Sequence, residues 1–209
     1  MLRVGGLAVV AALLLAGCSS GGDGDGQAAP PATTAAPSGT ASATGSPTPS
    51  PTPELPTGCA SLLPFTDLDS ALGRPLFGQS RYVKGAAQPS IGRTGRITCQ
   101  YGLNAQGRGT PYVEVGISDY ASAEAAAKRI QATISAERGA GATQGEATVG
   151  GLPATLLGGG KVVTLVLAQG SRTVVITLQR TLARNLGSGI DLNKAATGVA
   201  EKVLANLTG

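Results

Sequence analysis

The sequence predicts that residues 59–209 form a single α+β domain, in which a mainly antiparallel sheet is covered by two or three helices. Apolar and polar residues alternate along 97–103 and 113–117, which is the pattern of strands that bury one face. Helical spacing of apolar residues follows the capping residues Ser122 and Asp191. Because runs of strands are separated by helices, we expect the helices to pack on one face of the sheet.

Two helices are expected in the first half of the domain. Residues 66–69, Thr-Asp-Leu-Asp, fit a capping box in front of a short helix that Gly73 ends. Ser122 can cap a second helix, which runs from Ala123 to about Arg138 and ends at Gly139. The apolar stripe of this second helix, which we expect to face the sheet, comprises Ala123, Ala127, Ile130 and Ile134.

The second half predicts a run of strands followed by a helix. Gly170-Ser171 suits a two-residue hairpin turn, and 162–167 is apolar on both faces, which predicts a central strand. Asp191 can cap the last helix. Each half then runs from strands to a helix, which suggests a duplicated βββα-like unit, although no residue-level repeat accompanies it. The expected strands are 147–149, 154–157, 161–169 and 172–179, and the stripe of the last helix is Leu192, Ala196, Val199, Val203 and Leu207.

The first residues are typical of a bacterial export signal. Arg3 gives a positive start, and 4–15 is an apolar run of about twelve residues, too short to span a bilayer. The run ends in Leu15-Ala16-Gly17-Cys18, which resembles the bacterial lipobox at all four positions. A cysteine suits this place because a thiolate is nucleophilic enough to take a diacylglyceryl group as a thioether.

The lipobox resemblance implies cleavage before Cys18 and acylation of the new amino group, for example with palmitate. Two or more fatty chains hold a protein stably on a bilayer. The predicted organisation is therefore a signal peptide at 1–17, a lipidated Cys18 with a stalk at 18–58, and a folded domain at 59–209. The expected location is the extracytoplasmic face of the cell membrane.

The predicted stalk consists mainly of Gly, Ala, Ser, Thr and Pro. It carries almost no large apolar residue and cannot bury enough surface to offset the entropy of ordering, so we expect disorder. A proline at every second residue in 47–53 favours semi-rigid polyproline II, which would hold the domain away from the membrane. Sugar modification of the hydroxyl groups and an unmodified spacer both fit this composition.

Cysteine and histidine usage bounds the chemistry of the domain. Cys59 and Cys99 remain once Cys18 is lipidated, and such a pair in an exported protein is most simply a disulfide. The chain has no His, which excludes His-dependent catalytic triads and His-ligated metal sites. We therefore expect no cofactor, no metal and no enzymatic activity.

Basic residues gather in 78–96, a polar and Gly-rich segment. Residues 59–209 carry fifteen Lys and Arg against nine Asp and Glu, a balance that favours anionic neighbours. The segment is either an anion-contacting loop or an ordinary solvated loop. Nucleic acid is an unsuitable partner because aromatic residues for stacking are scarce. The candidate anion contacts are Arg81, Lys84, Arg93 and Arg96.

Short motifs resemble an actinobacterial cell-envelope lipoprotein family of unknown function. They are a Cys-x-x-Leu-Leu start at 59–63 and a Cys-Gln-Tyr strand at 99–101, together with the lipobox and the Ser/Thr/Pro stalk. The resemblance implies a cell-envelope protein with one disulfide, and it transfers no catalytic residue.

The leading hypothesis is a membrane-anchored, non-catalytic binding or accessory module. Its partner would be an anionic envelope polymer, a lipid or an envelope protein. A second hypothesis is a carrier or sensor with an internal pocket for a small amphiphile, since a core of short side chains leaves space. A third is a hydrolase that uses two carboxylates, those of Glu114 and Asp119.

Overall fold

The computed structural model describes residues 54–187 and 189–208. The predicted signal peptide, Cys18 and the stalk up to residue 53 lie outside the described residues, so those assignments stay predictions. Within the described ranges, no helix is both long and apolar enough to cross a membrane.

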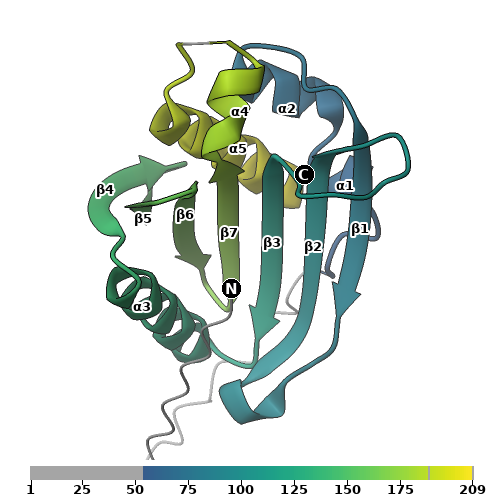
Figure 1. The fold of residues 1–209 in the computed structure, drawn as a ribbon. Helices are drawn as coiled ribbons and strands as arrows, with labels where there is room; N and C mark the ends of the chain where they lie inside the picture. The colour runs from purple at the N-terminus through teal and green to yellow at the C-terminus, as the bar shows by residue number, and fades with distance from the viewer. Residues whose placement is uncertain (1–53, 188, 209) are drawn as a thin grey trace, which may run out of the picture. The chain divides into compact units, whose positions relative to one another are not determined.

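The described residues form one antiparallel sheet of seven strands and five α-helices, which confirms the α+β prediction (Figure 1). The helices are α1 (Cys59–Leu62), α2 (Phe65–Leu72), α3 (Ala123–Gly139), α4 (Arg180–Asn185) and α5 (Leu192–Thr208), with a 3₁₀ turn at Pro89–Ile91. The strands are β1 (Gln79–Gly85), β2 (Arg93–Leu103), β3 (Val113–Tyr120), β4 (Thr143–Val149), β5 (Leu152–Gly159), β6 (Val162–Gln169) and β7 (Arg172–Gln179).

The strands lie in the order β1-β2-β3-β7-β6-β5-β4. Two antiparallel meanders, β1 to β3 and β4 to β7, meet where β3 pairs with β7. The predicted hairpin between β6 and β7 is confirmed, and Gly170 adopts a φ of 56° at its turn, a conformation that glycine takes without steric cost. β6 lies between β5 and β7, so the prediction of a central strand is also confirmed.

The two faces of the sheet have different covers. Leu165 and Val166 are neighbours on β6 and therefore point to opposite faces. Leu165 belongs to the large core under α1, α2 and α5, which we call the disulfide face. Val166 belongs to a small cluster under α3 with Ile130, Ile134 and Leu157, which we call the α3 face. The expectation that helices cover only one face is wrong, because a strand that is apolar on both faces needs cover on both.

The helices that follow the two meanders lie on these opposite faces, α3 after β3 and α5 after β7. A two-fold repeat about an axis through the β3–β7 pair would place both helices on the same face. The placement of the two helices therefore does not support the prediction of a duplicated βββα-like unit.

The start of α2 differs from the prediction and its end agrees with it. The helix begins at Phe65 after Pro64, and no side chain caps it, so the predicted capping box is wrong. Asp69 instead accepts a hydrogen bond from the backbone N–H of Leu76 (2.8 Å), beyond the end of the helix. Gly73 ends α2 with a φ of 69°, as predicted.

The start of α3 was predicted correctly. The Ser122 hydroxyl accepts a hydrogen bond from the backbone N–H of Ala125 (3.1 Å). Ala123 and Ala127, which were placed in the apolar stripe, are exposed, because the buried row has strict four-residue spacing. The residues of α3 that are buried are Ala126, Ile130 and Ile134.

Asp191 caps α5 as predicted. Its carboxylate accepts hydrogen bonds from the backbone N–H groups of Asn193 (2.9 Å) and Lys194 (3.2 Å). Leu192 and Leu207 of the predicted stripe are partly buried against the core of the disulfide face. The fully packed residues of α5 are Ala195, Ala196, Val199, Ala200, Val203 and Leu204.

Strand β1 was missed by the sequence analysis. The segment 78–96 was expected to be a loop, but 79–85 pairs with β2 along the edge of the sheet and only 86–92 connects the two strands. β1 carries few apolar residues because the α3 face is uncovered at this edge, and a one-sided edge strand tolerates polar side chains.

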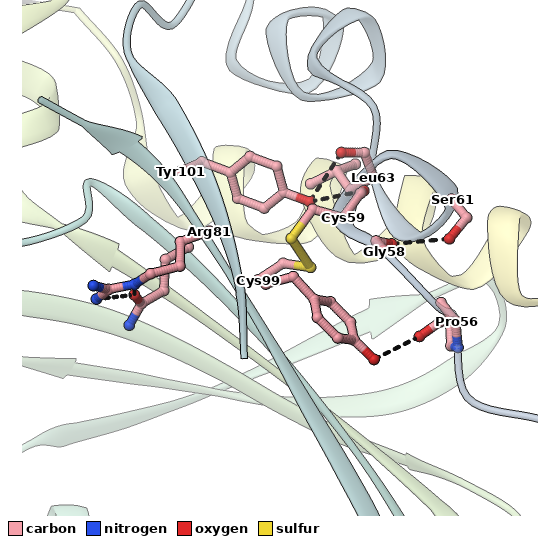
Figure 2. The surroundings of a disulfide bond; sticks show 10 residues. Pro56, Gly58, Cys59, Ser61, Leu63, Arg81, Cys99 and Tyr101 are labelled. Atoms are coloured by element: carbon pink, nitrogen blue, oxygen red, sulfur yellow. Dashed lines mark hydrogen bonds between the residues drawn. A yellow bond between two sulfur atoms is a disulfide. The ribbon is translucent and has the colours of Figure 1, made fainter. Parts of the chain in front are cut away.

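The predicted disulfide joins Cys59 of α1 to Cys99 of β2, with the two Cα atoms 5.5 Å apart (Figure 2). Beside it, the Tyr101 hydroxyl lies within hydrogen-bonding distance of the backbone carbonyl oxygens of Leu63 (2.9 Å) and Cys59 (3.2 Å). The ring of Phe65 packs edge-on against the Tyr101 ring, with the centroids 5.6 Å apart. The disulfide and the tyrosine together attach the short helix α1 to the sheet.

The folded unit begins before Cys59. Leu55 packs against the core of the disulfide face, and the Tyr82 hydroxyl donates a hydrogen bond to the carbonyl oxygen of Pro56 (3.1 Å; Figure 2). The last residues that the sequence analysis assigned to the stalk therefore contact the domain, because Leu55 offers an apolar side chain that the core can bury.

Candidate anion-binding site

The four basic residues proposed from the sequence do not form one loop. Arg81 and Lys84 lie on the edge strand β1, where alternation places Arg81 on the α3 face and Lys84 on the disulfide face. Arg93 and Arg96 lie at the start of β2, and a register shift between Arg93 and Gly95 lets both line the α3 face. The structure therefore places Lys84 on the opposite face, and it brings only Arg93 and Arg96 to the same hollow.

A hollow of about 120 Å³ lies between α3 and the strands β2, β3 and β7. Arg93 and Arg96 line it from the sheet, and Arg129 lines it from α3. We call this hollow the arginine groove. Arg129 was not among the residues predicted from the sequence, although its position next to Ile130 of the apolar stripe was an available signal. The remaining lining residues are Glu114, Gly116, Ser118, Tyr120, Ile130, Thr133, Thr173 and Val175.

Gly116 leaves the floor of the groove open. A Cβ added there would meet only ordinary contacts at 3.9 Å, with the Arg96 guanidinium nitrogen Nη2 and with Val175. The guanidinium group of Arg96 therefore lies close to the space above Gly116. Ser118 and Thr173, which are 8% and 3% exposed, add hydroxyl groups to the lining. The side chains of the floor are therefore short and polar, whereas a sheet face covered by a helix is normally apolar.

The arginine groove concentrates positive charge. The ion pairs among residues 54–187 and 189–208 are Arg172–Asp119 and Lys202–Asp67, so neither Arg93, Arg96 nor Arg129 has a carboxylate partner there. The Nε atom of Arg93 is buried and has no hydrogen-bond partner within this part of the chain. A buried donor without a partner costs about 1–3 kcal/mol. An anion in the groove would balance the positive charge of the three arginines.

A chain of side-chain hydrogen bonds runs from Arg81 on β1 through Gln100 on β2 to Glu114 on β3, a lining residue of the groove. Arg81 donates to the side-chain oxygen of Gln100 from Nε (2.9 Å) and Nη2 (2.6 Å). Gln100 donates in turn from Nε2 to Oε2 of Glu114 (2.8 Å). The two arginine contacts fix the orientation of the amide, and the amide fixes the Glu114 carboxylate beside the groove.

No protein-family model matches the chain. No curated protein matches it either. Among solved structures, the extracellular domain of PknH from Mycobacterium tuberculosis is similar, with a TM-score of 0.45 and 11% sequence identity over 72% of this chain and 94% of that one.

The carboxylate pair proposed for a hydrolase is separated by the fold. Glu114 lines the α3 face, whereas Asp119, five residues further along β3, points to the disulfide face. There Asp119 accepts hydrogen bonds from Nε (2.6 Å) and Nη2 (3.0 Å) of Arg172, in a buried ion pair. The two carboxylates lie on opposite faces of the sheet and cannot act on one bond. The prediction that Glu114 and Asp119 form a hydrolytic pair is therefore wrong.

A larger hollow, of about 780 Å³, flanks α3 on its other side, between the helix and the strands β4, β5 and β6. Ile130 lies between the two hollows and lines both. Short side chains, among them Ala127, Ala147 and Ala168, make the space, and Gln131, Gln144 and Glu146 contribute polar groups. A hollow of this size, lined by both apolar and polar side chains, is the feature that the hypothesis of an amphiphile carrier requires.

We also searched residues 54–187 and 189–208 for side chains that could together bind a metal ion. No three His, Cys, Asp or Glu side chains gather there in a group that could hold a metal ion. The donors that line the arginine groove are guanidinium and hydroxyl groups, the types that hydrogen-bond to anions.

Proposed function

We propose that this chain is a lipid-anchored extracytoplasmic lipoprotein whose domain is a non-catalytic binding module, and that the arginine groove takes an anionic group of a cell-envelope component. One observation carries the proposal. Three guanidinium groups from two separate elements, Arg93 and Arg96 from β2 and Arg129 from α3, surround one hollow without an ion pair among the described residues.

The anchor is supported by the lipobox that ends in Cys18 and by the disulfide. Disulfides persist in oxidising compartments outside the cytoplasm, so Cys59–Cys99 fits an exported chain. A test is the Cys18→Ser chain expressed in a bacterial host. We expect this variant to leave the membrane fraction and to lack the mass of the lipid groups. Equal membrane retention of the two chains, with an unmodified start in both, would overturn the anchor.

The groove suits an anion because its donors are charged. Hydrogen bonds to charged groups contribute about 1.5–3 kcal/mol each, roughly twice a neutral one. A guanidinium group presents several N–H donors in a fixed plane, which matches oxyanions. An anion that contacts all three arginines would therefore bind measurably even at the surface, where water and salt weaken each contact.

The binding test uses the mature chain with Cys18→Ser, which stays soluble, and insoluble envelope material from a bacterial host. Cosedimentation is measured at low salt and at about 0.5 M salt, where the Debye length falls below roughly 5 Å. We expect binding at low salt that salt weakens. The double variant Arg96→Gln and Arg129→Gln should bind at least tenfold more weakly.

A matched control removes the same charge elsewhere. Arg108 and Arg138 are exposed and do not line the arginine groove. The double variant Arg108→Gln and Arg138→Gln should bind within about twofold of the parent chain. If both double variants lose binding equally, the net charge of the chain and not the groove is responsible. If neither does, the groove is not the binding site.

The hollow between α3 and β4–β6 favours a second candidate function, a carrier of a small amphiphile. Its volume lies within the 300–1,000 Å³ typical of pockets that bury a small molecule. Native mass spectrometry of the chain purified from its host tests this candidate. A bound lipid-like mass that the substitution Ala168→Gln abolishes would support it, and a single ligand-free mass would count against it.

A further inference from the structure

The arginine groove has two ends of opposite charge. Arg93, Arg96 and Arg129 gather near one end, and the Glu114 carboxylate lies at the other. Gly116 and Glu114 project to the same face two residues apart on β3, roughly 7 Å along the strand. The groove thus offers donors for an anion at one end and a hydrogen-bond acceptor, Glu114, further along the same strand.

We propose, on the basis of the function proposed above, that the anion in this groove is the phosphoryl group of a phosphorylated polyol. The phosphoryl oxygens contact the three arginines, and a hydroxyl group three or four bonds from the ester oxygen donates to Glu114. The volume of about 120 Å³ is too small to bury a whole ligand, so the groove holds one end of a larger molecule.

The directions of the arginines favour a phosphoryl group over a carboxylate. Arg93 and Arg96 approach from the sheet and Arg129 approaches from the helix above it. A planar carboxylate is matched by one guanidinium fork, whereas the tetrahedral phosphoryl group offers three oxygens in three directions. Three arginines and one glutamate leave two positive charges, and a phosphate monoester carries about −1.5 to −2 at pH 7.

The hydrogen bonding of Glu114 favours a ligand that has a hydroxyl group beside the phosphate. Ionised carboxylates only accept hydrogen bonds, and Gln100 satisfies the Oε2 atom of Glu114. The other oxygen is free to accept from a ligand, and the phosphoryl group of a monoester dianion carries no hydroxyl of its own to donate. An ammonium group would also serve, but its positive charge cancels part of the phosphoryl charge, so such a ligand matches the two remaining positive charges less well. The hydroxyl group of a polyol supplies the donor and keeps the ligand anionic.

The test uses residues 18–209 with Cys18→Ser. Each probe is titrated into this chain, and the changes in its NMR chemical shifts measure affinities in the millimolar range. Four probes are used: inorganic phosphate, glycerol 3-phosphate, phosphoethanolamine and glycerol. We expect glycerol 3-phosphate to bind at least fivefold more tightly than inorganic phosphate, and glycerol alone not to bind. The variant Glu114→Gln should remove that advantage and leave the affinity for inorganic phosphate equal or higher.

The outcomes separate this inference from the function on which it rests. If no phosphate compound binds in an Arg96-dependent way, the anion site itself fails. If inorganic phosphate binds through Arg96 as tightly as glycerol 3-phosphate, the anion site stands and the polyol is overturned. Tightest binding of phosphoethanolamine would replace the hydroxyl by an ammonium group and overturn the proposal in the same way.

A second variant blocks the groove without removing charge. Gly116 has an ordinary backbone conformation and room for a side chain, so Gly116→Val should fold, with an unchanged or higher Tm. It should weaken glycerol 3-phosphate binding at least tenfold. Gly145→Val on β4 is the matched control, since Gly145 also has room and lies outside the groove, and it should leave binding unchanged. Equal binding by both valine variants would overturn the site.

A lipid headgroup and a wall polymer can both present this chemistry. Vesicles that contain phosphatidylglycerol carry it on a membrane, and soluble glycerol phosphate oligomers carry it on a polymer. The variant Gly116→Val should lose binding to whichever source the groove recognises. Binding to vesicles that survives this substitution would be ordinary surface attraction to negative charge and would overturn the membrane source.

Discussion

The disulfide face and the α3 face of the same sheet are stabilised in different ways. Under α1, α2 and α5 the sheet carries a continuous apolar core and a disulfide. Under α3, a small cluster of four buried apolar residues, two from the sheet and two from the helix, adjoins a polar groove. On the first face even the Tyr101 hydroxyl is satisfied by backbone carbonyl groups. On the second, Arg93 keeps a buried donor without a partner.

With the proposed function, this contrast divides the two tasks, stability on the disulfide face and recognition on the α3 face. A binding site needs donors that the protein itself does not satisfy, and such donors destabilise the unliganded fold. The chain can hold them on the α3 face because the disulfide face secures the sheet. The four predictions below test this division, from the largest expected change in stability to the smallest.

Removal of the disulfide should give the largest effect. The bond closes a loop with a sequence separation of 40, for which the chain-entropy relation gives about 4 kcal/mol. We expect the variant with Cys59→Ala and Cys99→Ala to lose that much free energy of unfolding in urea denaturation. Reduction of the parent chain should give a similar loss. A loss below about 1 kcal/mol would show that the apolar core of this face suffices alone.

Truncation of one isoleucine on each face compares the two cores directly. Ile176 of β7 is fully buried on the disulfide face, and Ile134 of α3 is 6% exposed on the other. We expect Ile176→Ala to cost about 4 kcal/mol, near the upper end for such truncations, because its surroundings are fixed on all sides. Ile134→Ala should cost about 2 kcal/mol, since a single helix over a small cluster can shift to fill the space.

Urea denaturation of the two variants measures the difference. Equal losses would contradict the division between the faces. A larger loss for Ile134→Ala would reverse it and would make α3 the element on which the sheet depends.

The elements that local physics specifies were predictable from the sequence. The alternation in β2 and β3 identified both strands, and the doubly apolar β6 was correctly placed inside the sheet. Ser122 and Asp191 marked true helix starts, because each side chain accepts hydrogen bonds from backbone N–H groups at its helix start. These signals lie within a few residues of the element that they define.

The elements that depend on distant partners were not predictable. β1 is polar, and only its pairing with β2 makes it a strand. Thr66 has the right type and spacing for a cap, but the packing of Phe65 on Tyr101 accompanies an earlier helix start. The arginine groove combines Arg93 and Arg96 with Arg129 from α3, and no sequence spacing relates the helix to the sheet. A site shared between elements appears only after folding.

Alkaline pH should weaken the disulfide face through Tyr101. Burial raises the pKa of Tyr101 above its ordinary value near 10, because the charged phenolate is poorly solvated in the core. A raised folded pKa means that stability is fully present below pH 10 and is lost as pH rises above it, by up to about 1.4 kcal/mol per pH unit.

The variant Tyr101→Phe isolates this effect. At neutral pH we expect it to cost about 1–2 kcal/mol, because the buried carbonyl oxygen of Leu63 loses its donor, whereas that of Cys59 still accepts from the backbone N–H of Leu63. Its stability should fall less steeply than that of the parent chain between pH 10 and pH 11, as followed by urea denaturation. Parallel curves for the two chains would mean that Tyr101 does not titrate with folding.

The two helix starts give the smallest effect and relate stability most directly to local sequence. α3 packs through a short buried row, so its cap should matter, and Ser122→Ala should cost about 1 kcal/mol. α2 has no side-chain cap and packs into the large core, so Thr66→Ala should stay within about 0.5 kcal/mol of the parent chain. Hydrogen exchange of the α3 amides should rise in Ser122→Ala, while exchange in α2 should not change in Thr66→Ala. If both variants cost the same, the Ser122 cap contributes no more than the uncapped position Thr66, and the start of the helix that carries Arg129 is held by packing alone.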